Sequence, residues 1–285
     1  MKKKLIAGLL VSAMAVSLSG CGASKTEEAP AAGDSAAEET AEAEPVTLNV
    51  FAAASMTETL TEIQEMYKDV APNVTLVFNF DSSGTLKTQI QEGADCDLFI
   101  SAAQKQMNQL DKDADPEVNT EGLDYVLEGT RVNLLENKVV LAVPDGNPKD
   151  IESFEDLGTD RLSLLALGNE DVPVGQYSTE ILTNLGILDS LEAEGKITYG
   201  SNVKEVTTQV SEAAADAGII YATDAFSAGL TVVDQAEGDL CKQVIYPAAV
   251  LNISKNPEAA KEFRAYLQTD TCMQVFEAVG FTAAE

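Results

Sequence analysis

VTLNVFAAASMTE, residues 46–58, indicates how the folded part of this chain begins. The β-rich run 46–51 predicts a strand, and Ser55 with Glu58 three residues later is a capping-box pattern that predicts a helix to about Lys68. A strand that passes directly into a helix is the start of a βαβ unit. The small residues before Ser55 therefore lie at the carboxyl end of a predicted strand.

The same alternation continues along the chain. Further strands are predicted at residues 74–78, 97–100, 138–143, 162–166, 218–221 and 243–246. Helices are predicted at residues 84–91, 104–110, 175–185 and 203–214, after Asn256-Pro257, and before Gly280. This order favours an α/β fold with mostly parallel sheets covered by helices on both faces. Residues 46–285 are enough for one large or two modest domains.

The N-terminus has the pattern of an export signal. Three lysines, an apolar run from Leu5 to Leu18 and the small residues Ser19 and Gly20 precede Cys21, so residues 1–20 are interpreted as a signal peptide. The tetrapeptide 18–21 is similar to a bacterial lipobox, which implies that Cys21 is acylated and anchors the chain to the extracytoplasmic face of the cell membrane. An ordinary signal with an incidental Cys21 is the alternative. Residues 21–45 have seven acids against one lysine and predict a disordered tether.

Composition excludes several classes of protein. The formal charge of −29 disfavours nucleic acid and anionic lipid as partners. The absence of His removes the commonest catalytic base and the commonest transition-metal ligand. Cys96, Cys241 and Cys272 are odd in number, so at least one is a free thiol; burial is the favoured interpretation of each, and whether Cys241 pairs with Cys272 stays open.

Hydrogen-bond donors gather where the predicted strands pass into helices. Ser55 follows the first strand, Asp81-Ser82-Ser83-Gly84-Thr85 the second, residues 170–175 and Asn202-Val203 precede later helices, and Tyr221 ends a buried strand. Each has an ordinary interpretation alone, as a cap, a turn or a core residue. Together they would surround one small anion with neutral donors at helix N-termini.

The chain resembles the molybdate-binding receptors of ABC importers over nearly all of residues 46–282. The resemblance is carried by six motifs in order: FAAAS (51–55), Ser82-Ser83 before Thr85-Leu86, ADCDLFISA (94–102), DVPVG (171–175), GIIY (218–221) and GFT (280–282). It implies a two-lobed, periplasmic-binding-protein-like (type II) fold with the ligand cleft between the lobes. It also implies a ligand set of Ser55, Ser83, the backbone N–H groups of Val174 and Val203, and Tyr221.

Two positions depart from the pattern of that family. Val174 stands where Ala is common, and Gly84 stands where another Ser is common. A backbone donor tolerates the first change, although a branched side chain could reshape the pocket. Asp81 beside the site would repel an anion, so we expect its side chain to point away or to cap a helix.

The sequence therefore predicts a receptor and not an enzyme. Lobe I is expected from residues 46–131 plus 247–285, and lobe II from 132–246. A monomer without a cofactor would bind molybdate, and tungstate as well, and deliver it to an ABC permease. The alternatives are a receptor for sulfate, phosphate or an organic acid, an exported hydrolase with Ser55 as nucleophile, and a surface protein that binds no ion.

Overall fold

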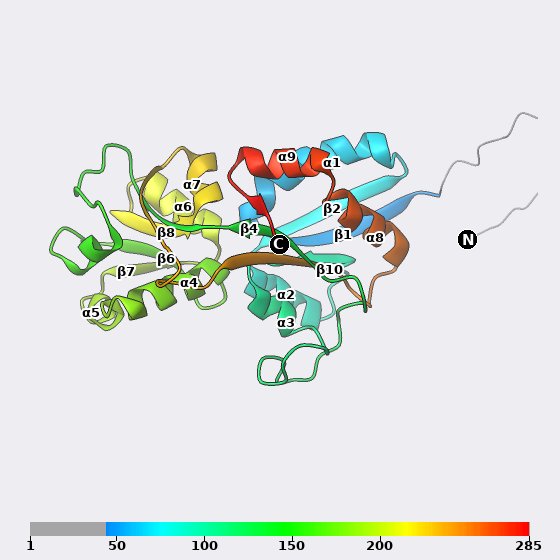
Figure 1. The fold of residues 1–285 in the computed structure, drawn as a ribbon, viewed down its shortest axis with the longest axis horizontal. Coiled ribbons are helices and arrows are strands. Elements are labelled where there is room, and N and C mark those ends of the chain that lie inside the picture. Colours follow the sequence, from blue (N-terminus) through cyan, green and yellow to red (C-terminus); the bar gives the residue numbers. More distant parts are fainter. Residues whose placement is uncertain (1–43, 285) are drawn as a thin grey trace, which may run out of the picture. The chain divides into compact units, whose positions relative to one another are not determined.

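The computed structural model describes residues 44–284, and the strands of this part form two sheets (Figure 1). The predicted signal peptide, the predicted lipidation site at Cys21 and nearly all of the predicted tether lie outside these residues. Within residues 44–284, no helix has the length and apolar character needed to cross a bilayer.

The first sheet has six strands in the order β11-β4-β10-β3-β1-β2. Its strands are β1 (Val46–Ala53), β2 (Val74–Asp81), β3 (Leu98–Ile100), β4 (Val132–Asn137), β10 (Val244–Val250) and β11 (Thr282–Ala283). The pairs β1–β2 and β1–β3 are parallel, whereas β10 pairs antiparallel with β3 and β4. We call the part built on this sheet lobe I.

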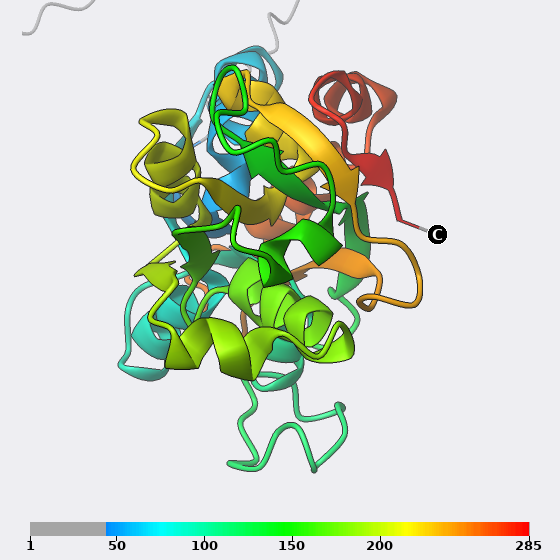
Figure 2. The same ribbon diagram turned by 90° about the vertical axis from the view of Figure 1, so that its left-hand side faces the viewer.

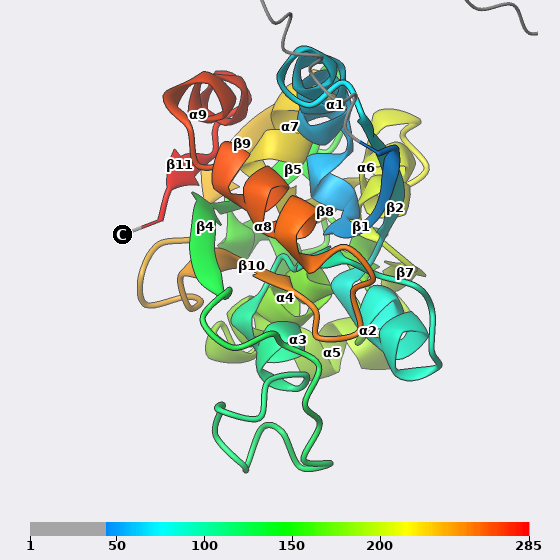
Figure 3. The ribbon, with the colours of Figure 1, turned by 90° about the vertical axis from the view of Figure 1, so that its right-hand side faces the viewer.

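Helices cover both faces of the lobe I sheet (Figure 3). They are the 3₁₀ turn η1 (Ala54–Met56), α1 (Thr57–Val70), α2 (Ser83–Gln91), α3 (Gln104–Asn108), α8 (Pro257–Tyr266) and α9 (Asp270–Ala278). Helices α2 and α3 lie on one face, and α1, α8 and α9 on the other. The central strand β1 is buried from Val50 to Ala53, as the apolar run in the sequence requires.

The second sheet has five strands in the order β7-β6-β8-β5-β9, and the part built on it is lobe II. Its strands are β5 (Val139–Val143), β6 (Leu165–Gly168), β7 (Ile197–Gly200), β8 (Ala217–Tyr221) and β9 (Thr231–Gln235). Its helical segments are η2 (Phe154–Gly158), α4 (Pro173–Asn184), α5 (Leu188–Ala193), α6 (Val203–Ser211) and α7 (Ala222–Ala228). Helices α4 and α5 lie on the opposite face from α6 and α7 (Figure 2).

The predicted α/β class and the two-lobed architecture are confirmed. The chain passes between the sheets after Asn137 and returns before Val244, whereas the sequence placed the boundaries at 131/132 and 246/247. The boundaries differ because β4 and the start of β10 pair with each other, so both strands belong to the lobe I sheet. Strands β4, β7, β9 and β11 were not predicted.

Two local predictions fail for identifiable reasons. Strand β6 begins at Leu165 and not at Leu162, because the N–H groups of Ser163 and Leu164 donate to the Asp216 carboxylate instead of to a neighbouring strand. The capping box of Ser55 and Glu58 does not form; the chain makes the η1 turn first, and the Ser55 hydroxyl bonds elsewhere. The three cysteines of the described residues are free, with Cys96 and Cys272 buried and Cys241 half-buried.

Candidate functional site

The strand-to-helix junctions of both lobes meet around one small cavity of about 10 Å³. Its lining residues are Ala53, Ala54, Ser55, Asp81, Ser82, Ser83, Ala102, Val172, Pro173, Val203 and Tyr221. Four of the five predicted ligand residues, Ser55, Ser83, Val203 and Tyr221, are therefore brought together. Val174 is not part of this lining, although its neighbours Val172 and Pro173 are. The carboxyl ends of β1, β2 and β8 form the junctions, as expected for ligand sites in α/β sheets.

Ser83 is held so that its hydroxyl hydrogen is available to a ligand. The side chain is fully buried in the first turn of α2, and its Oγ accepts the N–H of Ala102 at 2.9 Å. A hydroxyl has one hydrogen to donate, and this contact uses only its acceptor capacity. The neighbouring Ser82 has the other role available to a serine at a helix start, since its Oγ accepts the N–H of Thr85 as the N-cap.

Ser55 is held by residues that the sequence did not single out. Its Oγ lies 2.8 Å from the phenol oxygen of Tyr246, and Asn137 Nδ2 donates to the same phenol oxygen at 3.2 Å. When the phenol donates to Ser55, every hydrogen in this chain points toward the cavity and the Ser55 hydroxyl can donate to a ligand. Asn137 is the last residue of β4, where the chain leaves the lobe I sheet.

Tyr246 and Asn137 gave weak signals in the sequence. Tyr246 is the last residue of the predicted strand 243–246, and Asn137 directly precedes the predicted strand 138–143. Their role depends on two segments more than 100 residues apart in sequence that pair as β4 and β10.

Tyr221 provides a second phenol at the cavity. It is 1% exposed, and its hydroxyl donates to the carbonyl of Ala102 over a long distance of 3.5 Å. Burial raises the pKa of Tyr221 well above its ordinary value, so the phenol stays protonated and keeps its hydrogen for donation.

Two helix N-termini of lobe II are directed at the same region. Val174 and Val203 occupy the first turns of α4 and α6, where backbone N–H groups have no intrahelical partner and carry the positive end of the helix dipole. Asn202 is confirmed as the N-cap of α6, because its side chain accepts the N–H of Glu205 at 3.1 Å. The Val203 N–H is thus left for another acceptor.

The Asp81 carboxylate already has donors. Its Oδ1 accepts the N–H of Ser82 at 2.7 Å and lies 3.4 Å from Nδ2 of Asn202 in the other lobe. The residue is half-buried and lines the cavity, and the cap of α2 is Ser82 instead. Two donors on the carboxylate reduce the repulsion that it would exert on an anion.

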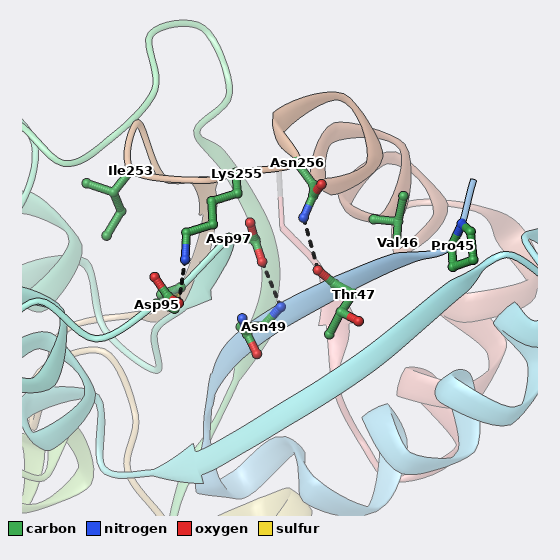
Figure 4. Close-up of a pocket in the computed structure, with 10 residues that line it drawn as sticks. Pro45, Val46, Thr47, Asn49, Asp95, Asp97, Ile253, Lys255 and Asn256 are labelled. Carbon is green, nitrogen blue, oxygen red and sulfur yellow. Dashed lines mark hydrogen bonds and ion pairs between the residues drawn. The ribbon is translucent and has the colours of Figure 1, made fainter. Parts of the chain in front are cut away.

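A larger pocket of about 310 Å³ lies at the opposite end of β1 and is less suited to an anion (Figure 4). Asp97 in its wall accepts from the backbone N–H of Asn49 and from the Ser254 hydroxyl, and Asp95 pairs with Lys255. The two carboxylates of this pocket outnumber its one cation, Lys255. The pocket also lies away from the carboxyl ends of the parallel strands.

Comparison with known proteins supports a receptor. Residues 48–282 match the family described as bacterial extracellular solute-binding protein. The chain belongs to that family. YvgL of Bacillus subtilis (strain 168), whose name provisionally describes an ABC transporter substrate-binding lipoprotein, is 38% identical over 84% of this chain and 87% of its own.

Two further members of the family are similar over most of their length. The molybdate-binding protein ModA of Haemophilus influenzae is 33% identical over 83% of this chain and 90% of its own. A solved substrate-binding domain from Clostridium difficile, provisionally assigned to a molybdenum ABC transporter, is 36% identical. It covers 84% of this chain and 100% of its own, with a TM-score of 0.62.

Proposed function

We propose that this solute-binding protein is the receptor of an ABC importer for molybdate, that it also takes tungstate, and that it delivers the ion to a membrane permease. The observation that carries the proposal is the convergence of Ser55, Ser83, Tyr221 and the N-terminus of α6 on one buried cavity. A desolvated oxyanion needs many hydrogen bonds, and Ser55, Ser83 and the first N–H groups of α6 can donate to it without a counter-charge. The Tyr221 hydroxyl would exchange its long bond to the carbonyl of Ala102 for one to the ion. The names of the relatives support the same ligand.

The charge distribution also favours neutral recognition. Lys204 lies in the first turn of α6, and its Nζ lies 2.7 Å from Glu58 and 3.0 Å from Asp224. It is therefore already paired on both sides. We infer that the ion is held by oriented dipoles, which explains how a chain with a charge of −29 can bind an anion.

The hydrolase alternative is disfavoured by the surroundings of Ser55. The hydroxyl bonds to the phenol of Tyr246, and burial raises the pKa of that phenol well above its ordinary value. A protonated phenol cannot accept the proton of a serine nucleophile at neutral pH. We therefore propose a receptor that has no catalytic activity and needs no cofactor.

Calorimetric titration with molybdate, tungstate, sulfate and phosphate tests the ligand. We expect tight binding of the first two and none of the others, because smaller tetrahedra cannot reach all donors at once. A preference for sulfate or phosphate, or silence with all four ions, would contradict the proposal. Ser82→Ala, which removes the N-cap of α2 from a neighbouring residue of the cavity lining, is the comparison variant for substitutions of Ser83.

We further propose that the protein is a monomer anchored by a lipid on Cys21, downstream of a cleaved signal peptide. The lipobox-like tetrapeptide and the name of the Bacillus subtilis relative support this. Metabolic labelling with a radioactive fatty acid should mark the wild type and not Cys21→Ala. Equal labelling of both would exclude the anchor.

A further inference from the structure

The loops that border the cavity are joined across the two lobes by a backbone hydrogen bond. The N–H of Gly84 in α2 of lobe I donates to the carbonyl oxygen of Asp171 in lobe II at 3.0 Å. Gly84 follows Ser83, and Asp171 precedes Val172, so the bond lies one residue from the cavity lining on both sides. It can form only when the lobes are together.

Both partners are prepared for this contact by their own lobes. Gly84 is the second residue of α2, where the N–H has no partner within the helix, and it is buried. On the other side, Asn169 Oδ1 accepts the N–H of Asp171 at 3.0 Å, and the N–H of Asn169 donates to Gly200 O at 3.0 Å. The turn that presents the Asp171 carbonyl is thus tied to β7.

Only glycine fits at position 84 in this arrangement. A Cβ added there would overlap the carbonyl oxygen of Asp171 and would lie 2.9 Å from both the carbonyl carbon and the Cα. These are backbone atoms, which cannot rotate away as the end of a side chain could. Any larger residue would hold the two lobes further apart.

We propose that the Gly84–Asp171 bond is the closure contact of this receptor and that Gly84 is a positioning residue for ligand binding. It acts by letting lobe II approach until the N-terminus of α6 and Tyr221 face Ser55 and Ser83. The inference rests on the proposed function for its ligand. It concerns residues that need not touch the ion themselves.

The test measures closure and affinity separately. Spin labels are placed on Val70→Cys in lobe I and Glu192→Cys in lobe II, both exposed positions. Cys21→Ser and Cys241→Ser in the full chain remove the other accessible thiols. Electron–electron double resonance then gives the distance between the lobes with and without molybdate, and calorimetry gives the Kd.

Gly84→Ala is compared with Gly238→Ala, whose added Cβ meets no atom within 4 Å. We expect Gly84→Ala to bind molybdate at least about tenfold more weakly and to stop short of the wild-type closed distance at saturation. Gly238→Ala should match the wild type in its affinity for molybdate and in its closed distance. Equal ligand-free unfolding temperatures would show that lobe I remains folded.

Other results would overturn the closure contact. One such result is a Gly84→Ala variant with wild-type affinity and the wild-type distance between the spin labels at saturation. Another is weak binding with full closure, which would mean that the substitution disturbs only Ser83. Asn169→Ala provides a second variant if Gly84→Ala does not fold, because it loosens the turn that presents the Asp171 carbonyl. We expect it to lengthen the distance between the spin labels at saturation. An unchanged distance would count against the contact.

The outcome stays distinguishable from failure of the proposed function. If the wild type binds no molybdate, the proposed ligand is wrong. The closure contact is then tested by the distances between the two spin labels in the ligand-free chains. A larger closed population in the wild type than in Gly84→Ala would then support the contact. Identical distributions would overturn it.

Discussion

Ser82 and Ser83 are chemically identical neighbours that have different roles in the structure. Ser82 accepts a backbone N–H as the helix cap, whereas Ser83 accepts the N–H of Ala102 and faces the cavity. Their order relative to the start of α2 decides which one can donate to a ligand. Ser82→Ala therefore tests the helix cap, and Ser83→Ala tests the hydroxyl that can donate to a ligand.

Ser83→Ala should weaken molybdate binding by about tenfold or more, because one ligand hydrogen bond is lost. It should also destabilise the fold by about 1–3 kcal/mol, since the buried N–H of Ala102 loses its acceptor. Calorimetry and urea unfolding measure the two effects. Ser82→Ala should cost about 1 kcal/mol of stability with little effect on affinity; the reverse order of affinities would contradict this assignment.

Tyr246→Phe tests the hydrogen-bond chain that holds Ser55. The ring remains in the core, but Ser55 loses its side-chain partner within residues 44–284, so its hydroxyl is free to rotate. We expect affinity for molybdate to fall several-fold, by about 1 kcal/mol. Tyr199→Phe, at an exposed position, is the control. Unchanged affinity in Tyr246→Phe would remove Tyr246 from the site.

At the scale of elements, α6 and α7 are joined to α1 by charges around Lys204. Lys204 in α6 reaches Glu58 in α1 and the buried Asp224 in α7. Both carboxylate oxygens of Asp224 lack a hydrogen bond of good geometry within the described residues, so the 3.0 Å contact with Lys204 is its main compensation. Burial raises the pKa of Asp224 from 3.8 to about 6, although Lys204 opposes the shift.

This pKa predicts how stability depends on pH. Between about pH 4 and 6 the folded chain keeps a proton on Asp224 that the unfolded chain has lost, so this group makes the fold less stable as pH rises through that range. The loss amounts to about 3 kcal/mol and is complete about one pH unit above the folded-state pKa. Tyr221 and Tyr246, which also face Asp224, remain protonated there.

Asp224→Asn should remove that dependence. The difference in unfolding free energy between variant and wild type should therefore shift in favour of the variant by up to about 3 kcal/mol from pH 4 to pH 7.5. Urea unfolding at the two pH values measures it. A difference that is the same at both would show that Asp224 is ionised throughout.

At the scale of the whole molecule, the cavity is built from both lobes, so its ligand should stabilise the native state. At a molybdate concentration of 100 times Kd, the free energy of unfolding should rise by about 2.7 kcal/mol. Thermal unfolding with molybdate and with sulfate measures the effect, with sulfate as the control ion. An equal response to both ions would indicate a general salt effect.

The sequence by itself determined the α/β class and the donor-rich junctions. Apolar runs, turn residues and caps act over a few residues, and the cap at Asn202 formed as predicted. The ligand set, including Val174, stays a prediction, although four of its five residues meet at one cavity. That set came from a resemblance over the whole chain, not from any one motif.

Only the tertiary structure decided the partner of Ser55, the separate roles of Ser82 and Ser83, and the bond between Gly84 and Asp171. Each depends on atoms that are far apart in sequence: Ser55 with Tyr246, Ser83 with Ala102, and Gly84 with Asp171. A hydroxyl or an N–H at a helix start has several possible partners, and local sequence does not choose among them. The packing of the two sheets and the approach of the two lobes make that choice.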